Sequence, residues 1–103
     1  MTMTERSLET IDTPSLLIDR DRLERNLAWM QEKADRFGVK LRPHTKTHRC
    51  PALARRQEEL GAKGITVAKL GEAEVMAREG LTDIFISTGS DWMPPPPTLL
   101  RRY

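Results

Sequence analysis

The stretch RPHTKTHRC, residues 42–50, gathers the side chains of this sequence that are best suited to chemistry. Alternate positions in it carry Arg42, His44, Lys46 and His48. If the stretch is a β-strand, alternate side chains share one face of the sheet, so all four would lie together. A buried parallel strand is normally apolar, and a cationic face is costly unless it points into a ligand site. The pattern therefore indicates a site at a strand end, where α/β folds place their active sites.

Lys46 is the candidate for covalent chemistry in this stretch. Like charges such as Arg42, together with removal from water, favour the neutral form of a lysine amine. A neutral amine attacks an aldehyde to form a Schiff base, as it does in enzymes that use pyridoxal phosphate. The alternative is that residues 42–50 form an exposed basic loop, and spacing alone does not decide between the two interpretations.

Two other chemistries are open to the same residues. His44 and His48 are four residues apart, as in helical zinc sites, but Pro43 opposes a helix and no glutamate follows His44. Cys50 precedes a proline and has no base fixed by a motif, so an ordinary half-buried thiol is the simpler interpretation. The residues thus favour neither a metal site nor a thiol nucleophile.

Lys69 is a rival for the amine nucleophile. In GITVAKL it shares a predicted strand face with Ile65 and Val67, although an ion-paired or solvent-reaching lysine is the commoner explanation. Glu72 and Glu74 suggest a carboxylate pair, but residues two apart point about 200° apart around a helix. We therefore expect both glutamates to be solvated and to stabilise the N-terminal end of their helix through its dipole.

The composition describes one small domain. A chain of 103 residues cannot hold a second domain beside the first. Seventeen lysines and arginines alternate with 15 acidic residues, so a net charge of +2 indicates no nucleic-acid surface. The single cysteine, Cys50, predicts a reducing compartment, and no segment approaches the ~20 apolar residues of a membrane span. We expect a cytoplasmic protein that binds neither nucleic acid nor membrane.

Strand and helix patterns alternate along the chain. Apolar runs predict strands at 15–18, 64–70 and 83–87, with a further strand over 39–48. Helices are predicted between them, and the first opens on a capping box of Asp21 and Glu24. The apolar stripe of that first helix is Leu23, Leu27, Met30, Ala34 and Phe37. Pro51 begins the second helix, and 71–80 is the third.

This order is the βαβ rhythm of a parallel sheet. We therefore predict an α/β fold, a partial (β/α) barrel, over residues 14–87. A polar lead-in, 1–13, precedes it. A proline-rich irregular tail, 88–103, follows it and has no helical period. A complete barrel needs about 250 residues, so only its first strands and helices are expected here.

Two long runs resemble a known family. DTPSLLIDRDRLERNL, residues 12–27, and the run from LRPHTKTH to DIFIS, residues 41–87, resemble the N-terminal part of the D-threonine aldolase and D-serine dehydratase family. These are fold-type III pyridoxal phosphate enzymes whose N-terminal domain is a TIM barrel like that of alanine racemase. By the motif RPHxKTH, the resemblance implies that Lys46 carries the cofactor as an internal aldimine. It also implies that Arg42 and His44 are cofactor neighbours.

The resemblance implies a lyase that acts on a small D-3-hydroxy amino acid. Full-length members also use a divalent metal, whose ligands belong to a C-terminal domain and are not expected in these residues. An N-terminal fragment of such an enzyme is therefore predicted to be inactive alone. The alternatives are an amino-acid racemase relative and a non-catalytic pyridoxal phosphate-binding or residual protein.

The tail sets the expected limits of the resemblance. SDWMPPPPTLLRRY, residues 90–103, departs from the family pattern, as a frameshift or a truncation would produce. Whether the chain alone is an enzyme, and whether its relatives' reaction is aldol cleavage, dehydration or racemisation, stays open at this point. Exposed barrel edges predict self-association.

Overall fold

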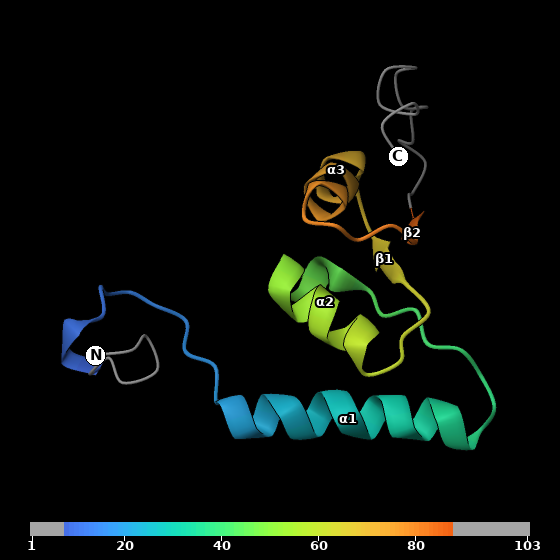
Figure 1. Ribbon diagram of the computed structural model, residues 1–103. Coiled ribbons are helices and arrows are strands. Elements are labelled where there is room, and N and C mark those ends of the chain that lie inside the picture. Colours follow the sequence, from blue (N-terminus) through green and yellow to red (C-terminus); the bar gives the residue numbers. More distant parts are fainter. Residues whose placement is uncertain (1–7, 88–103) are drawn as a thin grey trace.

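The computed structural model describes residues 8–87 of the chain (Figure 1). Its longer helices are α1 (Arg20–Arg36), α2 (Pro51–Glu59) and α3 (Leu70–Arg78). Two short 3₁₀ turns, η2 (Leu8–Thr10) and η3 (Thr45–Thr47), and the strands β1 (Ile65–Val67) and β2 (Ile84–Ile86) complete the described elements. The predicted proline-rich tail lies outside the described residues.

The strands form a small parallel sheet with β1 in the middle. Ile65 pairs with Ile84, and Val67 with Ile86, so β2 covers one edge of β1. The extended segment 41–44 covers the other edge, because Thr66 N–H donates to the Pro43 carbonyl at 2.8 Å. Helix α2 connects this segment to β1, and α3 connects β1 to β2. These are successive parallel βαβ connections, and the predicted α/β fold is confirmed.

The core lies between this sheet and the two connecting helices. Ala54 of α2 and Met76 of α3 are buried against Ile65 and Val67 of β1, with Ala73 and Leu81 in the same cluster. Small alanine side chains let the helices approach the strand closely, while β-branched residues fill the sheet. Figure 1 shows α2 and α3 stacked beside β1 and β2. This packing fixes where the segment 41–44 ends, and therefore where Lys46 stands.

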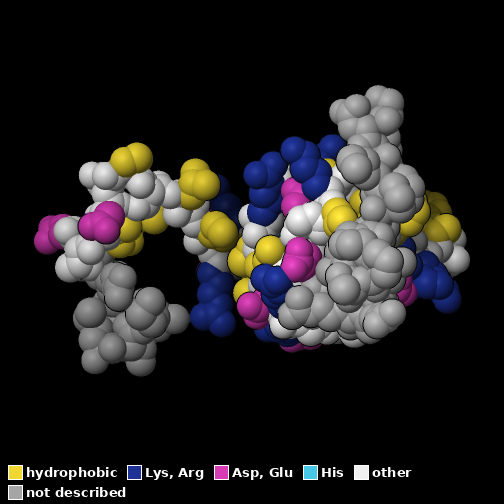
Figure 2. All heavy atoms as spheres, turned by 90° about the horizontal axis from the view of Figure 1, so that it is seen from above, with side chains coloured by type: hydrophobic (Ala, Val, Ile, Leu, Met, Phe, Trp, Pro, Cys, Tyr) yellow, Lys and Arg dark blue, Asp and Glu magenta, His cyan; other side chains and the backbone are white. Residues whose placement is uncertain are grey.

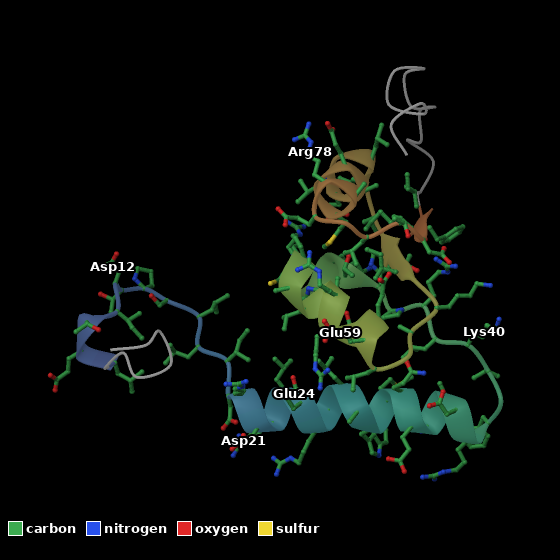
Figure 3. The ribbon with its side chains drawn as sticks, viewed as in Figure 1. Asp12, Asp21, Glu24, Lys40, Glu59 and Arg78 are labelled. Carbon is green, nitrogen blue, oxygen red and sulfur yellow. The ribbon has the colours of Figure 1, made fainter. Side chains whose placement is uncertain are left out.

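Helix α1 begins differently from the prediction. The side chain of Asp19, rather than Asp21, caps the helix by accepting the Arg22 N–H at 3.0 Å. Glu24 is not part of a capping box, because its carboxylate binds Arg56 of α2 at 2.9 Å. Figure 3 shows Glu24 pointing from α1 toward α2. This hydrogen bond to Arg56 lowers the pKa of Glu24 below its usual value.

The predicted apolar stripe of α1 is only partly buried. Ala34 is buried, but Met30 is 43% exposed and Phe37 is 68% exposed. Gln31, which lies off that stripe, is buried, and it packs against Gly61. The helix therefore contacts the α2 region through the Glu24–Arg56 ion pair and the buried Gln31, while Trp29 and Met30 stay exposed.

The strand predicted at 15–18 does not form. Leu16 is 99% exposed, and Leu17 and Ile18 are 65% and 62% exposed. A strand needs a partner for its backbone hydrogen bonds, and the structure shows none for this segment among residues 8–87. Figures 1 and 2 show the N-terminal segment extending away from the body, with hydrophobic side chains along it.

The helices of residues 8–87 were compared with the length and hydropathy that a membrane span requires. Within residues 8–87, none combines the length and the apolar composition of a transmembrane span.

Candidate functional site

The segment that carries the motif stops being extended at His44. Thr45–Thr47 form the turn η3, so the predicted alternation of Arg42, His44, Lys46 and His48 on one strand face is wrong. Thr45 is buried, and its hydroxyl donates to the Thr66 carbonyl at 3.2 Å. The His44 ring accepts the Lys46 N–H at 3.2 Å and caps the turn. These local side-chain bonds compete with the strand ladder and end it.

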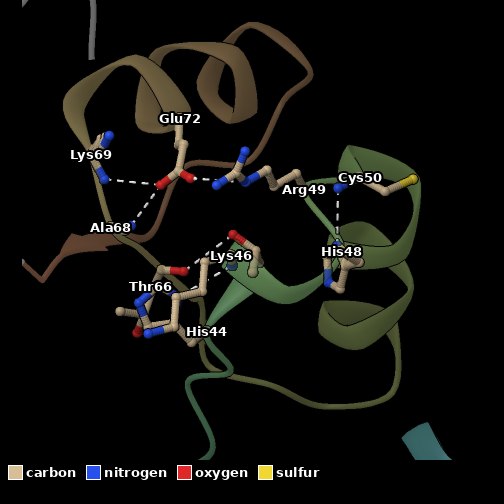
Figure 4. A network of polar contacts seen from close by, with 10 residues as sticks. His44, Lys46, His48, Arg49, Cys50, Thr66, Ala68, Lys69 and Glu72 are labelled. Atoms are coloured by element: carbon tan, nitrogen blue, oxygen red, sulfur yellow. Dashed lines mark hydrogen bonds and ion pairs between the residues drawn. The ribbon is translucent and has the colours of Figure 1, made fainter.

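Lys46 is exposed in this turn, as is Thr47. The Lys46 N–H is held by the His44 ring, and the preceding residue, Thr45, is buried and bonded to Thr66. Lys46 stands just beyond the carboxyl end of the segment 41–44, beside the carboxyl end of β1 (Figure 4). A primary amine on a fixed backbone at the carboxyl ends of parallel strands is placed where barrels of this kind do their chemistry. Lys46 thus lies at a strand end, and its part as the cofactor lysine stays a prediction.

The Arg42 side chain binds at the opposite, N-terminal end of the strands. Its guanidinium lies 2.7 Å from the carboxylate of Asp83 and 3.2 Å from the Asp83 carbonyl, at the start of β2. The hydrogen bond from Arg42 lowers the pKa of Asp83 below its usual value. Gly64 lies beneath this ion pair, and a β-carbon there would stand 2.6 Å from the Arg42 Nη1 atom. The structure therefore does not bring Arg42 to Lys46.

The two histidines of the motif serve different elements. His48 Nδ1 accepts the Cys50 N–H at 3.0 Å, so its Nε2 carries the proton and donates to the Gln57 Oε1 at 3.2 Å. The His44 ring instead accepts the backbone N–H of Lys46 in η3. Within residues 8–87, no group of three or more His, Cys, Asp or Glu side chains could hold a metal ion. Cys50 is a half-buried free thiol at the start of α2.

Glu72 is the residue whose role sequence reasoning missed. Its Oε2 accepts the N–H of Ala68 at 2.8 Å and of Lys69 at 2.9 Å, at the end of β1. Its Oε1 lies 3.5 Å from the Nε of Arg49, two residues after η3 (Figure 4). Its position in the sequence could have indicated this role, because Glu72 lies three residues after Lys69, at the N3 position of a capping box.

A cavity of about 300 Å³ lies between the η3 turn and α3. Its lining residues are Thr45, Arg49, Gly71, Glu72, Val75 and Met76. Lys46 is not among these, so the cavity adjoins the lysine-bearing turn from the side of α3. Lys69, the rival amine, is exposed at the start of α3, and its N–H is bound to Glu72.

Known proteins with related sequences are enzymes named for D-amino acids. The D-threo-3-hydroxyaspartate dehydratase of Delftia sp. strain HT23 is 50% identical over 78 residues, which cover 76% of this chain and 20% of the relative. The D-threonine aldolase of Arthrobacter sp. is 50% identical over 80 residues, covering 78% of this chain and 21% of the relative. This chain therefore spans about a fifth of the length of these relatives.

A solved structure has the same fold. The crystal structure of D-threonine aldolase from Filomicrobium marinum matches with a TM-score of 0.76 and 49% identity, over 79% of this chain and 22% of that one. The match supports the prediction of a partial (β/α) barrel.

The family model for the alanine racemase N-terminal domain matches residues 18–99. This match continues past residue 87, where the sequence resemblance was expected to end. The match covers most of the chain, and the relatives bear the names of the family that the motif RPHxKTH indicated. On sequence and on fold, the chain belongs to the alanine racemase N-terminal domain family.

Proposed function

We propose that this chain supplies the lysine-bearing part of a pyridoxal phosphate-dependent lyase that acts on D-3-hydroxy amino acids. The observation that carries the proposal is the exposed amine of Lys46 on a capped turn at the carboxyl ends of parallel strands. The names of the two relatives support the substrate class, since threonine and 3-hydroxyaspartate both carry a hydroxyl on C3.

The residues of the turn fit a covalently held aldehyde cofactor. Lys46 would hold pyridoxal phosphate through its Nζ atom, which displaces the aldehyde oxygen as water. When bound, the cofactor withdraws electrons from the substrate Cα. His44 holds the Lys46 backbone, so it orients the side chain that carries the group. Arg42 binds Asp83 at the other end of the strands, and its predicted part beside the cofactor stays a prediction.

We further propose that these 103 residues take up the cofactor without completing the lyase reaction. The matched part of the chain covers only 20–21% of these relatives, and no metal-ligating group of three side chains lies within residues 8–87. The turn leaves Lys46 exposed on its outer side, so water reaches the amine freely. Protection of that side is needed before a D-amino acid can be held in one orientation.

The test is to locate the cofactor on the chain. The full 103-residue protein is incubated with pyridoxal phosphate, reduced with borohydride and digested, and the modified lysines are identified by mass spectrometry. We expect the label on Lys46, its loss in Lys46→Arg and its retention in the matched variant Lys69→Arg. A label on Lys69, or one spread evenly over the exposed lysines, would overturn the assignment of Lys46.

A further inference from the structure

The carboxylate of Glu72 connects two parts of the site that the sequence separates. One of its oxygens holds the N–H groups of Ala68 and Lys69, at 2.8 and 2.9 Å, directly after β1. The other faces Arg49 at 3.5 Å. The Glu72 side chain is only 20% exposed, so its position is fixed more firmly than that of an ordinary surface glutamate.

Arg49 connects this carboxylate to the turn that carries Lys46. Its N–H donates to the Thr45 carbonyl at 2.7 Å. This bond closes the turn, because Arg49 lies three residues after Lys46. The Arg49 φ of 51° lies in the left-handed region, which a residue with a β-carbon adopts at a cost. The ion pair with Glu72 adds a second contact to the residue held in this conformation.

We propose that Glu72 is a positioning residue for Lys46. It holds the η3 turn against the carboxyl end of β1 through Arg49, and thereby fixes the direction from which the amine meets an aldehyde. The part of this inference that concerns the cofactor rests on the proposed function. The part that concerns the turn stands on the contacts of Glu72 and Arg49 alone.

Variants can separate the two contacts of this carboxylate. Glu72→Gln keeps an oxygen that accepts the backbone N–H groups but loses the charge that faces Arg49. Arg49→Asn removes the guanidinium while keeping a residue that tolerates the left-handed region. Arg49→Lys restores a positive charge at the same position. Glu74→Gln is the matched control, because it removes a charge from the same helix at its contact with Arg78.

The first measurement is amide hydrogen exchange by NMR on the full chain without cofactor. We expect the amides at positions 48 and 49 to exchange about twofold to fivefold faster in Glu72→Gln and Arg49→Asn. The expected change is small because an ion pair with an exposed arginine stabilises the turn only weakly. Arg49→Lys should restore part of the protection, and Glu74→Gln should change nothing at these positions. Equal exchange in Glu72→Gln and Glu74→Gln would overturn the role of Glu72.

The second measurement is the rate of cofactor attachment at Lys46 relative to Lys69 in the same sample. We expect this ratio to fall about twofold to fivefold in Glu72→Gln and in Arg49→Asn, and by no more in the double variant, because both changes remove one contact. A purely structural role would leave the ratio unchanged, and that result would overturn the proposal. If the wild type labels no lysine preferentially, the proposed function fails, while the exchange experiment still tests the restraint.

Discussion

The carboxylate of Asp83 is held in its charged form by the guanidinium of Arg42. A carboxyl group with a lowered folded pKa stabilises the fold above its unfolded pKa of about 3.9, and this contribution is lost as the pH falls through the lower folded value. We predict that acid destabilises the wild type through this window and that Asp83→Asn flattens the response. The measurement is the urea midpoint of unfolding of both proteins, taken at several pH values from neutral to strongly acidic.

A matched variant separates this pair from general charge effects. Glu32→Gln removes one carboxylate from an exposed pair with Arg36 on α1, 3.9 Å apart. We expect it to keep the steep acid response of the wild type. If Asp83→Asn and Glu32→Gln respond to acid alike, the Arg42 ion pair is not the source of the effect.

Residue roles were predictable to different degrees. The motif RPHxKTH singled out Lys46 as the cofactor lysine, and that role stays a prediction. It did not predict that Arg42 would bind Asp83, since that contact joins residues 41 positions apart. The bonds of Glu72 were likewise hidden, because they depend on where η3 stands relative to α3.

At the scale of elements, the strand ends meet at Gly64. A β-carbon at this position would lie 2.6 Å from Arg42 Nη1 and 2.8 Å from the Asp83 β-carbon. We predict that Gly64→Ala lowers the free energy of unfolding by about 1–3 kcal/mol, because the strands must move apart. Urea unfolding followed by circular dichroism measures the change.

Gly71 in α3 is the control for this substitution. A β-carbon there would meet nothing within 4 Å, and alanine favours helix over glycine. Gly71→Ala should therefore leave the free energy of unfolding unchanged or raise it by up to about 1 kcal/mol. A loss as large as that of Gly64→Ala would contradict the steric explanation.

The cap of α1 gives a second prediction for an element. Asp19 accepts the Arg22 N–H, whereas Asp21 lies inside the first turn. We predict that Asp19→Ala lowers helix stability by about 0.5–2 kcal/mol and that Asp21→Ala costs less. Far-ultraviolet circular dichroism during urea unfolding compares the two, and a larger effect of Asp21→Ala would restore the capping box expected from the sequence.

Elements were predicted where local pattern decides them and missed where pairing decides them. Helices α2 and α3, with β1 and β2, occupy stretches that periodicity, Pro51 and β-branched residues had indicated. The segment 15–18 has strand composition but no backbone partner within the described residues. The strand over 39–48 was cut short because the hydroxyl of Thr45 and the ring of His44 bind backbone groups.

For the whole molecule, the exposed side chains of Leu16, Leu17 and Ile18 are the main liability. Apolar surface of this kind favours association, by about 25 cal/mol for each Å² removed from water. We predict that the wild type self-associates with rising concentration and that Leu16→Asp with Ile18→Asp reduces it. Sedimentation velocity over a range of concentrations measures the assembly.

Asn26→Asp is the control for this pair, because it adds a negative charge at an exposed position on α1. It should leave the association unchanged. A wild type that sediments as a monomer at every concentration would contradict the prediction.

The parallel register of the sheet also has a consequence for the order in which the chain folds. Ile84 pairs with Ile65, and Thr66 pairs with His44, so each strand joins the one that precedes it by a single helix. The loops closed in this way are short, and closing them costs little chain entropy. Each βα unit can thus dock on the finished edge of the one before it as synthesis proceeds. The turn bearing Lys46 can therefore pair with β1 before β2 docks, and it gains the contact between Arg49 and Glu72 once α3 has folded.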